Sequence, residues 1–207
     1  MKITAFVNKS IRFVNKNCHL TVFWLVSLIE KIYLLSIGVK VGRNTRFNGW
    51  VHCYLSDNSR VSIGNNCRFN HRTFSNHLGH NHCCVLSTMM PGAKLMIGNN
   101  VGISSSSITA FSSILIKDNV RIGANCVIMD GDFHLDDPRS SIPLPVFIDE
   151  NVWLGYNVTV MKGVHIGKNS IIGADSIITC DIPENCVAAG NPCKVIKTMV
   201  NPLHDEK

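Results

Sequence analysis

The sequence predicts an all-β solenoid in which short parallel strands coil into a triangular β-helix behind an N-terminal helical segment. Three observations support this fold class. Branched aliphatics return at every sixth position of the stretch 148–178, glycine directly follows several of them, and Asn or Asp stands where a six-residue side has to turn. The aliphatics are Ile148, Leu154, Val160, Ile166, Ile172 and Ile178.

A period of six fits neither the 3.6 residues of an α-helical turn nor the two-residue repeat of an ordinary strand. Three such sides would complete one turn, so that each aliphatic stacks on its equivalent in the next turn. A β-sandwich would instead show alternation and turns of variable length. A small or β-branched residue comes four positions after each aliphatic. The corners need left-handed φ, which costs least at Gly, Asn and Asp. The small positions are Val152, Val158, Val164, Ser170 and Ser176, and the expected corners are Asn65, Asn99, Asn125, Asn157, Asn169 and Asp175.

Composition favours one domain, because 207 residues with 45% hydrophobic and 16% charged side chains supply a single core. The net charge of +6 is unevenly placed, with four basic residues before the first acidic one, Glu30. The nine cysteines are scattered, and Cys67, Cys126 and Cys186 fall at or near small repeat positions. We therefore expect reduced thiols in a cytoplasmic protein.

Residues 1–38 form the expected N-terminal, mostly helical segment. Its apolar run from His19 to Ile37 is interrupted by Glu30 and Lys31, which leaves pieces shorter than the ~20 residues that span a bilayer. No small-residue cleavage site marks a signal peptide. Two interpretations stay open. The segment packs against the coil or a neighbouring subunit, or residues 1–37 make a peripheral, basic amphipathic contact with an anionic membrane.

The expected β-helix covers residues 39–197, with loops at 71–94 and 129–147 and a tail at 198–207. The first loop is expected where the six-residue phase is lost. The second follows from the spacing of Ile128 and Ile148, which are twenty residues apart, two more than one full turn. An excursion from the coil must lie between them.

A cluster of histidines and cysteines in the first loop raises the question of zinc. Its spacing matches no standard structural zinc pattern, and the two adjacent cysteines are poorly placed to bind one ion together. We expect a surface loop and no metal. The cluster consists of His77, His80, His82, Cys83 and Cys84.

The coil resembles the left-handed β-helix acyltransferases with hexapeptide repeats, and most closely their sugar and polysaccharide O-acetyltransferase branch, to which galactoside and maltose acetyltransferases belong. The resemblance implies the left hand, which spacing does not reveal. It also implies acetyl-CoA as co-substrate and a homotrimer with active sites between neighbouring coils. The segments that carry it are Asn151-Val152-Trp153-Leu154-Gly155, Ile172-Gly173-Ala174-Asp175-Ser176, Asp181-Ile182-Pro183 and 188–197.

The excursion contains His134 among several aspartates. Transfer of an acyl group from a thioester to a sugar hydroxyl needs a base, and imidazole suits that role near neutral pH. The resemblance implies that His134 is this base. Asp132 and Asp136 each lie two residues away, so either carboxylate, or a backbone carbonyl, could orient the ring.

The remaining site residues are also carried over by resemblance. The backbone N–H of Tyr156 is expected to stabilise the oxyanion, although a smaller residue is usual there. Trp153 is expected either beside the acetyl or acceptor site or in a subunit contact. The expected acetyl-CoA contacts are Trp153, Tyr156, Ala174, Thr179, Cys180, Lys194 and Lys197, and the expected acceptor contacts are Asn100, Ser105, Trp153 and Arg139.

These expectations describe an acetyl-CoA-dependent O-acetyltransferase acting on a bacterial surface polysaccharide, oligosaccharide or precursor. No nucleic-acid partner is expected. One alternative is an acetyltransferase for a small molecule such as an antibiotic or amino acid. A second is a β-helix that serves as a non-catalytic scaffold.

Overall fold

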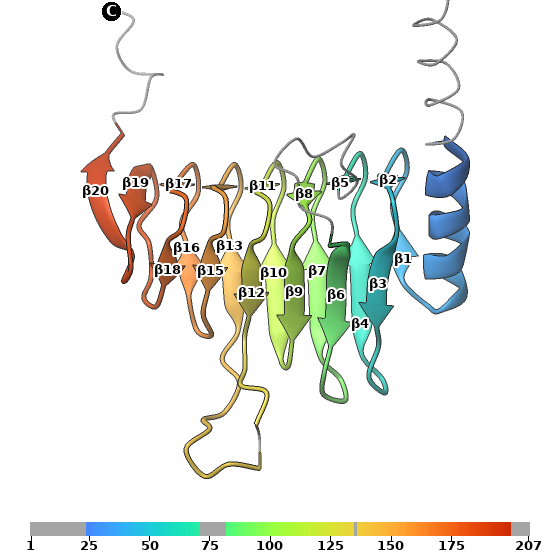
Figure 1. Ribbon diagram of the computed structural model, residues 1–207, viewed down its shortest axis with the longest axis horizontal. Helices are drawn as coiled ribbons and strands as arrows, with labels where there is room; N and C mark the ends of the chain where they lie inside the picture. Colours follow the sequence, from blue (N-terminus) through green and yellow to red (C-terminus); the bar gives the residue numbers. More distant parts are fainter. Residues whose placement is uncertain (1–23, 71–81, 135, 200–207) are drawn as a thin grey trace, which may run out of the picture.

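The computed structural model describes residues 24–70, 82–134 and 136–199, in which a helix (residues 24–36) precedes a coil of short strands (Figure 1). The strands form three sheets. Sheet A contains β1 (Lys40–Val41), β4 (Arg60–Ile63), β7 (Lys94–Ile97), β10 (Ser113–Ile116), β13 (Val146–Ile148) and β16 (His165–Ile166). Sheet B contains β2 (Arg46–Asn48), β5 (Arg68–Asn70), β8 (Gly102–Ser104), β11 (Arg121–Ile122), β14 (Trp153–Leu154), β17 (Ile171–Ile172), β19 (Cys186–Ala189) and β20 (Lys194–Thr198). Sheet C contains β3 (Val51–Tyr54), β6 (Cys84–Thr88), β9 (Ser107–Ala110), β12 (Val127–Met129), β15 (Thr159–Val160) and β18 (Ile177–Ile178).

The six-residue repeat is confirmed by the strand register. Ile148 in β13 pairs with Ile166 in β16, which follows eighteen residues later, or three sides of six. The same offset pairs the inward positions of β14 with β17 and of β15 with β18. Consecutive sides therefore belong to different sheets, and the chain visits A, B and C in turn. The inward aliphatics Ile148, Leu154, Val160, Ile166, Ile172 and Ile178 are all buried, and they stack in three columns of the core, one for each sheet.

Glycine at a corner is required by the close approach of adjacent turns. Stacked strands lie only about 4.8 Å apart, so the inner side of a corner faces the backbone of the next turn. A Cβ added to Gly123 would lie 2.3 Å from the carbonyl oxygen of Gly155, and one added to Gly64 would lie 2.3 Å from that of Gly98. The Ile-Gly and Leu-Gly pairs of the sequence thus mark places where only a residue without a side chain fits.

The corner residues adopt left-handed φ, as expected, at Asn125, Asn157, Asn169 and Asp175. In two corners the expectation is wrong by one residue, because the left-handed positions are Asn66 and Asn100 rather than Asn65 and Asn99. Asn65 and Asn99 instead use their side chains to join turns: the side-chain oxygen of Asn99 accepts the backbone N–H of Asn65 at 2.9 Å. A second amide ladder links Asn125 to Asn157 at 2.6 Å and Asn157 to Asp175 at 2.8 Å.

The small positions are buried at the inner side of the corners, where hydroxyl and thiol groups bond to backbone carbonyls. Ser170 Oγ donates to the carbonyl of Pro183 at 2.7 Å, and Cys126 Sγ donates to that of Gly155 at 3.1 Å. Burial raises the pKa of the Cys126 thiol to about 11. The eight cysteines of the described residues are free thiols.

The expected loop at 71–94 is too long. Strand β6 lies inside it and pairs with β3 and β9 in sheet C, with Leu86 in the core. The insertion is therefore confined to residues 71–83, of which 71–81 lie outside the described residues, as do His77 and His80. The sequence obscured β6 because an insertion precedes it and no glycine follows Leu86.

Each end of the coil is covered by a different element. At the C-terminal end β20 turns back and pairs antiparallel with β19. At the N-terminal end the helix lies across the first turn (Figure 1), and its Glu30 is buried with one oxygen accepting the N–H of Val51 at 2.9 Å. Burial raises the pKa of the Glu30 carboxyl. No helix of the described residues is long and apolar enough to cross a membrane.

Replacing Gly123 by alanine is expected to destabilise the coil by about 1–3 kcal/mol, because the new methyl group overlaps the backbone of the next turn. The matched control is Gly102→Ala, whose Cβ would meet only the Arg121 side chain, at 3.5 Å. Thermal unfolding followed by circular dichroism measures both. Equal melting temperatures for the two variants would contradict the close-approach explanation.

Candidate active site

The excursion between β12 and β13 forms a flap, residues 130–145, at the edge where sheets C and A meet (Figure 1). The coil continues undisturbed beneath it. Ile116 in β10 still pairs with Ile148 in β13, so the extra residues leave the stacking in place. The flap therefore projects from a regular prism, and Leu135 is its one residue outside the described part of the chain.

Asp130 fixes the root of the flap. Its carboxylate is buried and accepts the backbone N–H groups of Phe111 at 2.5 Å, Ser112 at 2.9 Å and Ser113 at 2.5 Å. These donors belong to the corner of the preceding turn. A buried carboxylate with three donors is a strong local anchor, because charge-assisted bonds are stronger than neutral ones.

Aromatic packing holds the next part of the flap. Phe133 meets Phe111 edge to face, with ring centroids 5.2 Å apart. Gly131 lies against the Phe111 side chain, and a Cβ there would be 2.6 Å from Cγ of Phe111. The residue before His134 is thus tied to the coil through the same corner that binds Asp130.

Lys162 joins the outgoing and returning parts of the flap to the next turn. Its ammonium group donates to the carboxylate of Asp132 and, at 2.5 Å, to Oγ of Ser141. Asp132 also accepts the N–H of Ser141 at 3.2 Å. The hydrogen bond from Lys162 holds the pKa of the Asp132 carboxyl below its usual range. Asp132 therefore has an anchoring role in this chain.

The backbone of His134 is held while its side chain is exposed. The carbonyl of His134 accepts the N–H of Asp137 at 3.1 Å and the hydroxyl of Ser140. Arg139 pairs with Asp137, and that salt bridge lowers the pKa of the Asp137 carboxyl. Among the described residues no hydrogen bond joins the His134 ring to Asp132 or Asp136, so the two aspartates remain open as orienting groups.

The other expected site residues lie on different edges of the prism. Tyr156 and Ala174 occupy the edge between sheets B and C, because they follow β14 and β17 and precede β15 and β18. Thr179 and Cys180 follow β18 and share the C–A edge with the flap. Trp153 points outward from sheet B and is 54% exposed. Within one chain, the flap on the C–A edge is therefore separated from Tyr156 and Ala174 on the B–C edge.

Lys194 and Lys197 lie on β20, whose residues are all exposed. Asn100 and Ser105 have structural roles that account for their positions. Asn100 has left-handed φ and its carbonyl accepts a bond from Arg121 at 3.1 Å, while Ser105 is buried at a corner. Neither position shows a feature that identifies an acceptor contact.

Sequence reasoning missed Lys162 and the anchoring roles of Asp130 and Asp132. A signal for Lys162 exists, since Met161-Lys162-Gly163 forms the C–A corner one turn after the flap and must lie beneath it. In the His/Cys cluster, Cys84 is buried in β6 and a ring nitrogen of His82 lies 3.0 Å from Oδ1 of Asn125. The described residues hold no group of three or more His, Cys, Asp or Glu side chains arranged for a metal ion.

Comparison with known proteins yields consistent matches. Residues 145–180 match the family described as bacterial transferase hexapeptide (six repeats). A Saccharomyces cerevisiae protein named "Putative acetyltransferase" is 41% identical over 111 residues, 51% of this chain and 57% of its own length. A Staphylococcus aureus protein of the same name is 38% identical over 133 residues, 52% of this chain and 67% of its own length. The chain thus spans little more than half of the yeast relative.

The fold also matches a solved structure of a galactoside acetyltransferase in complex with coenzyme A. The TM-score is 0.52 at 26% identity, over 88% of this chain and 79% of the other. This likeness, together with three sheets whose strands are parallel except for β20, confirms the left-handed β-helix.

Replacing Lys162 by methionine is expected to loosen the flap without unfolding the coil, because both its bonds are to flap residues. Trypsin cleavage after Arg139 should become about tenfold faster, as expected for the loss of charged hydrogen bonds. The pKa of Asp132 is lowered, so in the wild type this anchor persists at neutral pH and is lost only as acid protonates the carboxylate. Mass spectrometry of timed digests measures the rate.

The matched control is Lys168→Met, which removes an exposed ion pair with Glu184. Its cleavage rate should equal that of the wild type. A Lys162→Met protein with wild-type resistance at Arg139 would show that the flap is held by other contacts.

Proposed function

The chain belongs to the hexapeptide-repeat acetyltransferases, and from this we propose that it transfers an acetyl group from acetyl-CoA to a sugar hydroxyl of a surface polysaccharide, oligosaccharide or precursor. One observation carries the proposal: an anchored flap on a hexapeptide coil holds an exposed imidazole, that of His134, at the C–A edge. Galactoside acetyltransferase, with the same fold, supports a sugar as acceptor.

His134 acts as the general base in this proposal. Its neutral ring nitrogen takes the proton of the acceptor hydroxyl as the oxygen attacks the thioester carbonyl, and this proton then passes to the departing sulfur. The thioester supplies an activated acyl group, so no enzyme nucleophile is needed. A positioned base of this kind contributes about 10²–10⁴-fold to the rate.

The tetrahedral intermediate carries a negative oxygen that needs a donor. We assign this role to the backbone N–H of Tyr156, at the B–C edge, because a fixed N–H stabilises developing charge without reorganisation. Asp136 is the better candidate to orient His134, since Asp132 is bonded to Lys162 and Ser141. Trp153 would pack beside the acetyl group or the acceptor.

The active site is proposed to lie between two copies of the chain. His134 and Tyr156 lie at the two edges that border sheet C, on opposite sides of that sheet. A neighbouring coil can bring its B–C edge to the flap of the first, and three copies related by a threefold axis would complete three equivalent sites. A homotrimer satisfies this geometry.

Acetyl-CoA fits as co-substrate along the groove between two such coils. The small side chain of Ala174 leaves the B–C corner open for the pantetheine arm, and Thr179 and Cys180 are exposed on the C–A edge. Lys194 and Lys197 on β20 would face the nucleotide phosphates as point charges. Arg139, 89% exposed in its side chain, projects from the flap toward solvent and could contact the acceptor.

His134→Ala is expected to lower kcat by about 10²–10⁴-fold with the melting temperature unchanged, because His134 is exposed on the flap and lies outside the core. The assay incubates acetyl-CoA with a simple galactoside and a panel of neutral and acidic capsule oligosaccharides, and CoA release is quantified by chromatography. His52→Ala, an exposed histidine at the other end of the coil, is the control. Wild-type turnover in His134→Ala would contradict the assignment, and a wild-type protein without turnover on any acceptor would favour the scaffold.

Mixed oligomers test the shared site. His134→Ala and Ala174→Trp should each be inactive alone, since one lacks the base and the other blocks the donor groove. Co-refolded in equal amounts, they should recover about a quarter of the wild-type activity, because random mixing leaves that share of interfaces with both native edges. No recovery in oligomers shown to be mixed would place the whole site within one chain.

A further inference from the structure

The helix at the N-terminal end of the coil packs with its polar side toward the protein. Ser27 Oγ accepts the backbone N–H of Phe47 at 2.9 Å, and Glu30 accepts that of Val51. Lys31 Nζ donates to the carbonyl of Gly42 at 3.1 Å. These three polar contacts, with buried Leu34, fix the rotation of the helix against the first turn.

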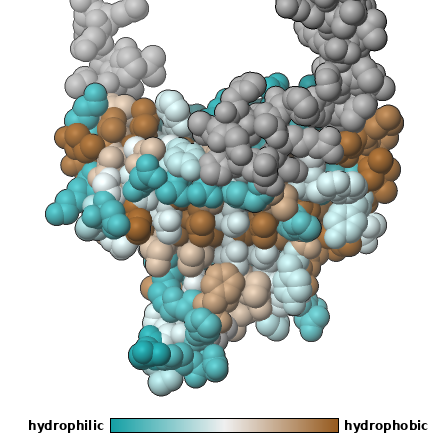
Figure 2. Space-filling view, viewed as in Figure 1, coloured by the Kyte–Doolittle hydropathy of each residue, from teal (hydrophilic) through white to brown (hydrophobic). Residues whose placement is uncertain are grey.

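The opposite side of the helix is apolar and exposed. A surface helix ordinarily turns its apolar stripe toward the core and its charges toward water, and here the arrangement is reversed. The exposed positions of residues 24–36 include no charged side chain. Figure 2 shows hydrophobic surface at this end of the molecule. The exposed apolar residues are Trp24, Leu25, Leu28, Ile29, Ile32, Tyr33 and Leu35, each 43–69% exposed.

The surroundings of this face are positively charged. Residues 24–56 contain four basic residues, Lys31, Lys40, Arg43 and Arg46, and one acidic residue, Glu30, which is buried. Lys40, Arg43 and Arg46 are exposed in the first turn of the coil. A second copy docking on this face would bring like charges together, whereas an anionic surface would be attracted.

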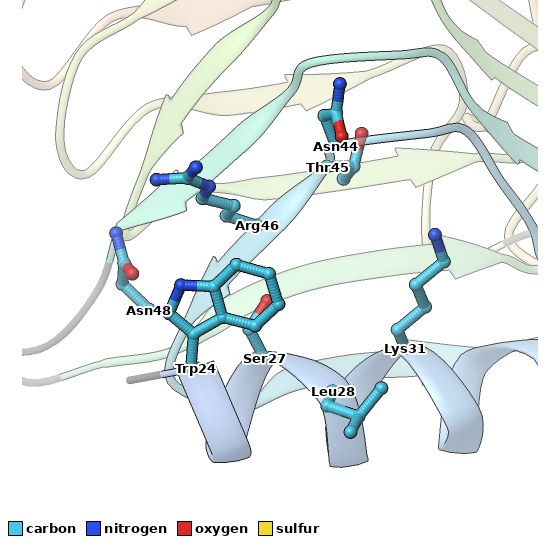
Figure 3. A pocket seen from close by; sticks show the side chains of 8 residues that line it. All are labelled: Trp24, Ser27, Leu28, Lys31, Asn44, Thr45, Arg46 and Asn48. Carbon is cyan, nitrogen blue, oxygen red and sulfur yellow. The ribbon is translucent and has the colours of Figure 1, made fainter. Parts of the chain in front are cut away.

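A cavity of about 380 Å³ between the helix and β2 is lined by both apolar and positively charged side chains (Figure 3). Trp24 and Leu28 give it an apolar wall, and Lys31 and Arg46 supply cationic groups. Lys31 uses one of its three ammonium donors for the carbonyl of Gly42, and no other hydrogen bond of its side chain is seen among the described residues. The cavity suits the phosphate of a lipid headgroup with the first carbons of its chains.

We propose that the helix end of the coil docks on the surface of an anionic phospholipid bilayer. Residues 24–36 lie in the interface with their apolar side toward the acyl chains, and Trp24 and Tyr33 sit at headgroup level. Lys40, Arg43 and Arg46 contact the anionic headgroups. This proposal is independent of acetyl transfer, because it concerns the opposite end of the coil from β20 and residues outside the flap.

The experiment mixes the purified full-length chain with vesicles of phosphatidylcholine alone or with added phosphatidylglycerol, and measures the bound fraction after sedimentation. The wild type should bind the anionic vesicles at least about tenfold better, and added salt should weaken that binding. Leu28→Ser with Ile32→Ser should lower binding about tenfold or more, since both side chains enter the interface. Arg43→Gln with Arg46→Gln should lower it on anionic vesicles only.

The matched control is Met96→Ser with Phe147→Ser, which removes two exposed apolar side chains from sheet A and should leave binding unchanged. Three results would overturn the proposal. They are equal binding to both kinds of vesicle, self-association without lipid that Leu28→Ser with Ile32→Ser abolishes, and a lower melting temperature of that variant with unchanged vesicle binding. The second result would show that the apolar face of the helix binds another copy of the chain, and the third that it packs within the same chain.

Discussion

Stacking of one aliphatic side chain on its equivalent a full turn away determines the rest of this structure. Ile116, Ile148 and Ile166 lie in one such column, in strands β10, β13 and β16, and all three are buried. The column forms only if every turn has the same height and the same three sides. Adjacent backbones then approach to about 4.8 Å, which excludes side chains from the inner corners and favours residues that tolerate left-handed φ.

This regularity lets the chain carry a long insertion without loss of register. The flap enters and leaves at neighbouring points of one edge, so the turn that contains it closes normally. Anchors for the flap then come from the turns on either side, through Asp130 bound to the preceding corner and Lys162 on the following one. A histidine on such a flap is held by the coil while its ring stays exposed, which suits a base that must meet a substrate bound partly by another copy.

The two ends of the coil expose backbone and core to solvent and need covers. The C-terminal cover is a strand, β20, which continues sheet B in the antiparallel direction. The N-terminal cover is a helix that packs through Ser27, Glu30 and Lys31 and leaves most of its apolar residues outside. Desolvation of Glu30 raises the pKa of its carboxyl, so the polar packing is achieved at a cost in stability that an apolar packing side would avoid. We therefore explain the outward apolar side of this helix by the bilayer surface on which it is proposed to dock.

The sequence by itself determined the coil, because a six-residue period between Ile148 and Ile178 has one simple geometric solution and each glycine reports a close backbone approach. It also located the flap, since twenty residues separate Ile128 from Ile148, but it misjudged the length of the insertion: the two residues lie on successive sides, β12 and β13, where the repeat expects six residues and not a full turn. Only the tertiary structure decided that Asp132 bonds to Lys162, that β6 lies inside the expected loop, and that the helix turns its apolar side outward. The physical reason is common to these cases. Periodicity fixes contacts that repeat along the chain, whereas contacts between an insertion or a cap and the coil occur once and depend on the folded geometry.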